Sequence, residues 1–169
     1  MDDSITIIDD FLPKTAFEKI QHTFIGNDCT FPWYYNRTKT YSDDIEDLTN
    51  FQFTHTFFDN NAEGSLYYRD LIFPFFVLLN PVSIIRVKAN LTGRTPHQIH
   101  YGFHIDIPEA ENKTAIYYVN SNNGKTLFAN GTEIDSVGNR MVIFDGSLLH
   151  SALSCTDQQV RCVINFNYF

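Results

Sequence analysis

Hydrophobic and polar positions in the first half of the chain predict one short helix, a strand and a second helical stretch. After Pro13, apolar residues in 14–24 recur at i, i+3 and i+7, which predicts a helix that covers one face of a sheet. Residues 51–58 alternate between apolar and polar types, which is typical of a strand. Residues 65–79 are largely apolar but contain Pro74, so they form either one bent helix or two helical pieces.

The chain from residue 82 onward has the pattern of short strands separated by turns. Its apolar residues show no sustained helical period, and turn residues such as those at 122–124, 130–131 and 145–146 stand between the apolar runs. Six strands are predicted, over residues 83–91, 99–107, 114–120, 126–130, 140–144 and 160–168. Many short strands with such turns favour a β-sandwich or a barrel.

His104 and Asp106 are the first candidate functional residues. In an unbroken strand their side chains project from one face, because successive residues alternate sides. His150, which closes the apolar run 141–150, is the candidate for a third ligand. Two histidines and one carboxylate on one side of a metal bind non-haem Fe(II) and leave coordination positions open. The alternative for the His-x-Asp pair is a solvated, hydrogen-bonded pair at the end of a strand.

The same alternation makes predictions for the neighbouring residues. His100 has the parity of His104, so it either approaches the pocket or binds substrate, unless a bulge at Gly102 interrupts the strand. Tyr101 has the opposite parity and is expected in the core. His97 is expected on the surface of a loop.

Arg161 is a further candidate functional residue, because this charged side chain lies inside the apolar run 160–166. An unpaired charge buried in such a strand is costly, so the guanidinium needs an anion. A carboxylate that accepts two hydrogen bonds is its best-matched partner. Strand alternation places Val163 and Asn165 on the same face as Arg161.

Five features occur in a characteristic order between residues 84 and 169. They are His-x-Asp at 104–106, Tyr-Tyr-x-Asn at 117–120, Gly-x-Thr-x-Phe at 124–128, the apolar run that ends at His150, and Arg161 on the last strand. In this order they resemble the 2-oxoglutarate and Fe(II)-dependent dioxygenases, above all the prolyl-hydroxylase-like branch and its small bacteriophage-encoded members. The resemblance implies a mostly β fold, a double-stranded β-helix or jelly roll with N-terminal helices packed on one sheet.

The resemblance also implies the cofactors and the site. Fe(II) would be bound by His104, Asp106 and His150, the catalytic group, with O₂ as the oxidant. The cosubstrate 2-oxoglutarate would be contacted by four residues: Arg161, Tyr118, Thr126 and Asn165. Of these, Arg161 and Tyr118 would bind its far carboxylate.

The reaction implied is hydroxylation of a C–H bond with release of succinate and CO₂. The substrate expected from the prolyl-hydroxylase-like branch is an unknown peptide or protein side chain. Asp106 favours hydroxylation over halogenation, because related halogenases have a small residue in its place. Position 167 is Asn, where nucleobase demethylases of the superfamily carry a second arginine, which argues against that branch.

Length, charge and cysteine content limit the remaining possibilities. With 169 residues, the chain is expected to form a single domain, with 1–81 as supporting strands and helices and 82–169 as the jelly-roll core. A formal net charge of −8 argues against non-specific binding of a phosphate backbone, so nucleic acid is not expected as a partner. No export signal or membrane-spanning run is visible, so a cytoplasmic location is expected, which is the host-cell cytoplasm if the protein is phage-encoded. The three cysteines are expected to be free thiols.

Three alternatives to a peptide hydroxylase stay open at the level of sequence. The first is a non-catalytic jelly-roll binding module that keeps the three ligands as a structural metal site. The second is a metal-binding cupin that uses no 2-oxoglutarate. The third is a nucleobase or small-molecule oxygenase of the same superfamily. The loops at 33–47 and 108–113 are expected to determine selectivity in any of these cases.

Overall fold

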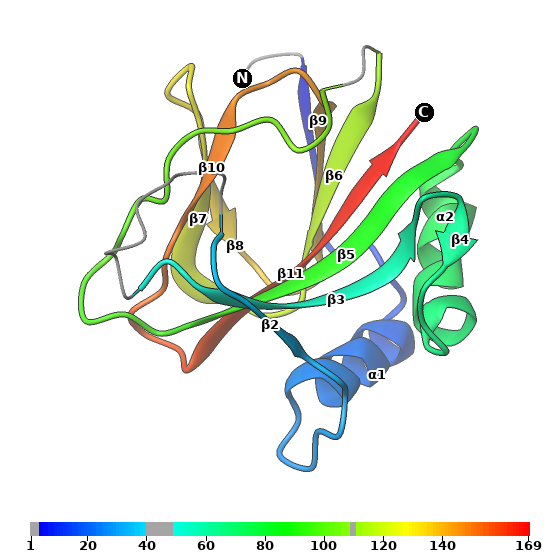
Figure 1. Cartoon of the computed structure of the whole chain (residues 1–169), viewed down its shortest axis with the longest axis horizontal. Coiled ribbons are helices and arrows are strands. Elements are labelled where there is room, and N and C mark those ends of the chain that lie inside the picture. Colours follow the sequence, from blue (N-terminus) through cyan, green and yellow to red (C-terminus); the bar gives the residue numbers. More distant parts are fainter. Residues whose placement is uncertain (1–3, 40–48, 109–110) are drawn as a thin grey trace.

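The structure of the chain is a computed structural model that describes residues 4–39, 49–108 and 111–169. Its strands form two antiparallel sheets that curve around a common interior (Figure 1). The major sheet has the order β1 (Ile5–Ile8), β9 (Arg140–Asp145), β6 (Lys113–Tyr118), β11 (Val160–Tyr168), β5 (Ile84–Gly93), β3 (Gln52–Asp59) and β2 (Tyr34–Asn36), and β4 (Ala62–Glu63) pairs with β3. The minor sheet has the order β10 (His150–Leu153), β7 (Asn122–Phe128) and β8 (Glu133–Ser136). The mostly β, jelly-roll architecture predicted from the sequence is confirmed.

The outer face of the major sheet is covered by helices. Helices α1 (Lys14–Ile25) and α2 (Phe73–Leu79) lie on one side of this sheet, away from the minor sheet (Figure 1). Phe24 of α1 and Phe75 of α2 belong to the same buried cluster as Phe166 of β11. The apolar spacing that predicted the first helix therefore marks the side that packs on the sheet.

The second helical stretch consists of two pieces. A π-helical turn, Tyr68–Ile72, leads directly into α2, and Pro74 lies in the first turn of α2. Proline is tolerated there because the first amides of a helix have no partner within the helix. Of the two forms expected for residues 65–79, the sequence therefore adopts the two-piece one.

The prediction of N-terminal helices as the layer on the sheet is not borne out in that form. In the described part of the first 81 residues, four strands accompany the two short α-helices. Strands β1, β2 and β3 are members of the major sheet, and β4 pairs with β3. The alternating pattern of residues such as 52–59 directs much of this part of the chain into the sheet, so the region supplies strands as well as the two short helices that pack on the sheet.

The predicted strand over 99–107 is also wrong. Its backbone makes only two isolated bridges, from His100 to Leu153 and from His104 to His150. Gly102 between them has a φ of +84°, which reverses the alternation of side chains. Tyr101 is buried, as its parity predicted, and it also lines the central pocket.

Strands β8 and β10 were not predicted, and β7 begins at Asn122, where the sequence predicted a turn. Of the two loops expected to determine selectivity, residues 40–47 and 109–110 lie outside the described residues. Between the sheets, an apolar cluster fills part of the interior. It consists of Ile116, Tyr118, Phe128, Ile134, Val142, Phe144 and Val163. The remainder of the interior is polar and contains the candidate site.

Candidate metal centre and adjoining pocket

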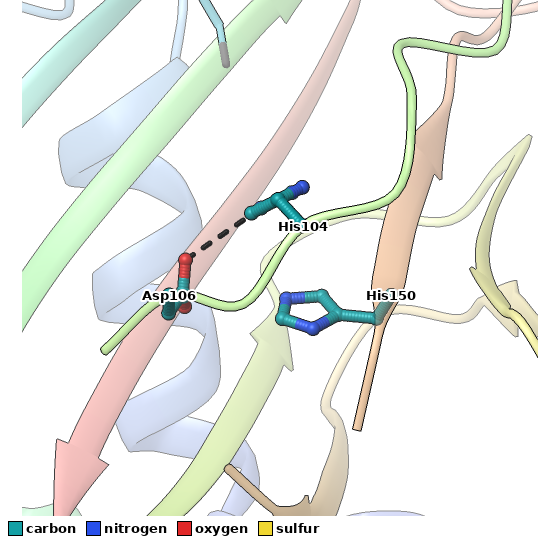
Figure 2. Close-up of side chains that lie close together, drawn as sticks. All are labelled: His104, Asp106 and His150. Atoms are coloured by element: carbon teal, nitrogen blue, oxygen red, sulfur yellow. Dashed lines mark ion pairs between the residues drawn. The ribbon is translucent and has the colours of Figure 1, made fainter. Parts of the chain in front are cut away.

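The three predicted metal ligands lie together. His104 and Asp106 follow Gly102 on the irregular segment, and His150 is the first residue of β10. The backbones of His104 and His150 exchange two hydrogen bonds of 2.9 and 3.0 Å, which bring these chain segments side by side. One ligand atom from each of the three residues lies within 4.8 Å of the others, and Figure 2 shows the side chains facing one another.

The carboxylate of Asp106 is held from both sides. Its Oδ2 accepts hydrogen bonds from the side-chain amides of Asn165, at 3.1 Å, and Asn167, at 3.4 Å. Its Oδ1 faces His104 Nε2 at 3.7 Å and Arg86 Nη2 at 3.5 Å. Two amides therefore fix one oxygen and leave the other directed toward the histidines.

The electrostatic surroundings keep Asp106 ionised. Burial alone raises the pKa of this carboxyl group. The close approach of His104 and the positive charge of Arg86 outweigh burial, so the pKa of Asp106 lies well below its ordinary value. An ionised carboxylate is the form that binds a metal.

His150 is oriented by its own chain. Its Nδ1 donates to the carbonyl of Leu148 at 3.1 Å, which leaves Nε2 free for a ligand bond. Burial is the largest influence and lowers the pKa of His150, so the imidazole is neutral near pH 7. Phe144 lies 4.9 Å from its ring, between centroids, on the apolar side. Two imidazoles and one carboxylate in this arrangement fit a ferrous ion, whose preferred facial set they match.

The central pocket extends from these ligands along the inner face of the major sheet to Arg161. Arg161 is 5% exposed. Its guanidinium donates long hydrogen bonds to Ser136 Oγ (3.2 Å), Thr126 Oγ1 (3.3 Å) and the Lys125 carbonyl (3.4 Å). Within the described residues, no carboxylate forms an ion pair with it. A ligand carboxylate would therefore supply the anion that this buried cation lacks.

Gly124 makes the position of Arg161 possible. A Cβ atom at residue 124 would lie 2.9 Å from Arg161 Cδ and 2.8 Å from the Leu153 carbonyl oxygen. The glycine of the Gly-x-Thr-x-Phe pattern thus admits the arginine stem between the two sheets. This explains why β7 tolerates a glycine that the sequence indicated as part of a turn.

Tyr118 and Thr126 meet at the same end of the pocket. The Tyr118 hydroxyl donates to Thr126 Oγ1 at 2.6 Å, and the Tyr118 ring centroid is 5.6 Å from Arg161 Cζ. Tyr118 is fully buried, and burial raises the pKa of its phenol, so the hydroxyl keeps its proton. Asn165 does not join this group, because its amide contacts Asp106 at the metal end.

Sequence reasoning missed Arg86, Lys88 and Asn167. Arg86 and Lys88 alternate with apolar residues on β5, and both line the outer part of the pocket. Asn167 follows Arg161 and Asn165 at the same strand parity, which was the available signal. Their contacts to Asp106 depend on which strands are neighbours, and the sequence does not contain that information directly.

The remaining histidines and the cysteines have other surroundings. His55 is buried, and its ring nitrogens contact the Pro32 carbonyl and Ser65 Oγ, both at 2.7 Å. The carbonyl of His97 accepts a hydrogen bond from Thr95, and the His100 ring packs against Phe103. The three cysteines are free thiols. In the described ranges, no helix combines the length and the apolar character needed to cross a membrane.

Solved structures with a similar fold include a prolyl hydroxylase from Trichoplax adhaerens in complex with a peptide fragment of the hypoxia inducible factor oxygen degradation domain. It matches with a TM-score of 0.64 and 15% identity, over 99% of this chain and 84% of its own. A viral collagen prolyl hydroxylase from Paramecium Bursaria Chlorella virus-1, in complex with 2-oxoglutarate, matches with a TM-score of 0.58 and 14% identity, over 99% and 96%. The non-haem α-ketoglutarate-dependent carbocyclase SnoK from nogalamycin biosynthesis matches with a TM-score of 0.66 and 10% identity, over 98% and 79%.

No protein-family model and no curated protein matches the sequence. At these identities the structural likeness establishes the fold, which is that of the 2-oxoglutarate-dependent oxygenases, prolyl hydroxylases among them.

Proposed function

We propose that this chain is an Fe(II)- and 2-oxoglutarate-dependent oxygenase that hydroxylates a C–H bond of a peptide or protein side chain, of the prolyl type. One observation carries the proposal. A single pocket has His104, Asp106 and His150 at one end and the buried guanidinium of Arg161 at the other. A diacid that binds a metal through one end presents its second carboxylate to that guanidinium.

The metal end would hold the ion that supplies the oxidative chemistry. His104, Asp106 and His150 would bind Fe(II), which, when bound, lets O₂ oxidise 2-oxoglutarate to succinate and CO₂ and oxidise a substrate C–H bond. Asn165 and Asn167 hold one oxygen of Asp106 and so direct the other toward the ion. Arg86 compensates the charge of the same carboxylate.

The other end would bind the far carboxylate of 2-oxoglutarate. Arg161 supplies the positive charge, and Thr126 and Tyr118 supply hydroxyl groups beside it. Because the guanidinium is almost fully buried, its attraction for an anion is little weakened by water. Ile116 and Val163 of the apolar cluster line the pocket between its two ends, so this stretch has an apolar wall.

The peptide part of the proposal rests on the similar structure from Trichoplax adhaerens, which contains a peptide. A small-molecule substrate is the second candidate, because the carbocyclase SnoK has a similar fold. A silent binding module with a structural metal is disfavoured by Arg161. Such a module would bear the cost of a buried cation without a carboxylate to pair with it.

The test of the proposed function is anaerobic addition of 2-oxoglutarate to the Fe(II)-loaded protein, followed by O₂. We expect a weak visible absorption band of the chelated keto acid, then loss of the band and formation of succinate. His150→Ala should give neither. If the wild-type protein binds Fe(II) but gives no band and no succinate, the pocket does not take this cosubstrate and the binding-module alternative gains support.

A further inference from the structure

The pocket concentrates positive charge in a chain whose formal net charge is −8. Lys39, Arg86 and Lys88 line its outer part, and Asp106 is the one acidic side chain among the described residues that line it. Two of these cations have polar partners. Arg86 Nη2 lies 3.5 Å from Asp106 Oδ1, and Lys39 Nζ donates to a backbone carbonyl at 2.7 Å.

Lys88 differs from both. It is partly buried on β5, and within the described residues no carboxylate lies within ion-pair distance of its ammonium group. Burial, followed by the charge of Arg86, lowers the pKa of Lys88, while the charge of Asp106 opposes this effect. A lysine in these surroundings costs folding free energy. An anion that joins it on binding recovers part of that cost.

The position of Lys88 separates it from the contacts proposed for 2-oxoglutarate. In the pairing of β5 with β11, Lys88 stands opposite Asn165, whereas Thr92 stands opposite Arg161. These two levels are about 14 Å apart along the strand, at roughly 3.4 Å per residue. The outer part of the pocket, a polar groove that includes Lys88 and Asp106, does not include Arg161. A molecule in this groove would touch the metal end without occupying the cosubstrate end.

We propose that the primary substrate carries a carboxylate group and that Lys88 binds it. This inference rests on the proposed function. One ferrous ion with Asp106 leaves one positive charge, which together with Arg161 balances the two carboxylates of 2-oxoglutarate. Arg86 already faces Asp106, so the charges of Lys88 and Lys39 remain for the substrate. The carboxylate is either the terminal α-carboxylate of a small acid or an acidic side chain of a peptide.

Two pairs of probes distinguish these sources. N-acetyl-L-proline and its carboxamide differ in the α-carboxylate alone. N-acetyl-L-glutamate α-amide and N-acetyl-L-glutamine α-amide differ in the side-chain carboxylate alone. Acetylation removes the ammonium group, which the cations of the groove would repel. Each probe is titrated calorimetrically into the anaerobic protein loaded with Fe(II) and 2-oxoglutarate, and again into the metal-free protein.

We expect the acid of at least one pair to bind about tenfold or more tightly than its amide, because a charge-assisted hydrogen bond contributes a factor of that size. Lys88→Met should remove this preference, and Lys88→Arg should retain it. Lys14→Met, on the exposed surface of α1, is the control. Lys88→Met should unfold at the same temperature as the wild type or higher, because it removes a partly buried charge.

Equal affinities within both pairs, including no binding by any probe, would overturn the proposal. So would an acid preference that survives in Lys88→Met, or a loss of 2-oxoglutarate affinity in that variant, which would assign the lysine to the cosubstrate. Failure of the proposed function would be detected separately, because the visible band of the chelated 2-oxoglutarate would be absent before any probe is added. In that case the titrations of the metal-free protein still decide whether Lys88 binds carboxylates.

Discussion

The two faces of the major sheet are made by the same strands and have opposite characters. On the helix side, β5 and β11 present fully buried apolar residues, namely Val87, Ala89, Cys162, Ile164 and Phe166. On the side facing the minor sheet, these strands present mostly polar or charged residues, namely Arg86, Lys88, Asn90, Arg161, Asn165 and Asn167, with Val163 as an apolar exception. A period of two residues therefore separates the stabilising face from the chemical face within one strand.

The difference shows that the helix side of the sheet stabilises the fold, whereas the side facing the minor sheet contains groups that are costly to bury. Burial of large apolar side chains beneath α1 and α2 is favourable, at about 1.5–3 kcal/mol for each side chain. The opposite face contains a buried arginine and two amide oxygens, Asn90 Oδ1 and Asn165 Oδ1, that have no hydrogen-bond partner among the described residues. Such groups are costly to bury. The helix face offsets that cost.

The largest effect is expected from Asp106→Ala on the chemical face. The change removes the carboxylate ligand and deprives Arg86 of its anion, so Fe(II) binding should be abolished, a loss greater than about 100-fold. Equilibrium dialysis of the anaerobic protein measures it. Asp135→Ala, an exposed carboxylate on β8, should bind Fe(II) like the wild type. Retained affinity in Asp106→Ala would show that this residue is not a ligand.

Phe166→Ala tests the opposite face of β11. The ring is fully buried against Phe75, so its loss should lower the free energy of unfolding by about 3–5 kcal/mol. Urea denaturation measures this value. Fe(II) affinity of the protein that remains folded should be unchanged. A large loss of metal affinity with little loss of stability would contradict the claim that one face stabilises the fold and the other binds the metal.

A smaller effect on the metal is expected from Asn167→Ala. This buried amide donates to Asp106 Oδ2 and to Thr114 Oγ1, and so helps to fix the direction of the carboxylate. Loss of such an outer contact typically weakens metal binding by about 10- to 100-fold. Dialysis against Fe(II) measures the metal affinity. Asn167→Asp adds a second anion, so it should not show the loss of Fe(II) affinity expected for Asn167→Ala. Unchanged affinity in Asn167→Ala would mean that Asn165 alone orients Asp106.

The smallest effect is expected from Tyr118→Phe at the Arg161 end. The change deletes one hydroxyl and keeps the ring, so 2-oxoglutarate affinity should fall by about three- to tenfold, the value of one hydrogen bond. Tyr117→Phe, which removes a hydroxyl on the helix side, is the matched control and should leave that affinity unchanged. Equal losses in both variants would indicate a general effect on packing.

Much of this arrangement was readable from the sequence, because alternation is a local property. The apolar parity of 160–168 predicted a strand, and β11 occupies it. His104, Asp106 and His150 could be proposed from residue type, order and family resemblance, and they lie together. Arg161 could be proposed as an anion-binding residue because a charged side chain inside an apolar strand is costly to bury without a partner.

The rest depended on information that is not local. The positive φ of Gly102 lies within the strand predicted over 99–107, which the structure does not form, and the parity of Tyr101 did not show that this buried ring also lines the pocket. Gly124 looked like part of a turn, but it admits the stem of Arg161 from another strand. The contacts of Arg86 and Asn167 with Asp106 follow from strand neighbours that lie far apart in the sequence. Residues 133–136 were missed because a four-residue strand offers too few positions to show a period.

The most direct test of the account is the 2-oxoglutarate affinity of the anaerobic Fe(II)-loaded protein, compared between the wild type and Arg161→Gln. The account predicts a loss of at least about 30-fold, because removal of one partner from a buried charge pair costs about 2–5 kcal/mol. Arg94→Gln, an exposed arginine that follows β5, should bind like the wild type. Equal affinity in Arg161→Gln and the wild type would contradict the claim that this face of the sheet binds 2-oxoglutarate.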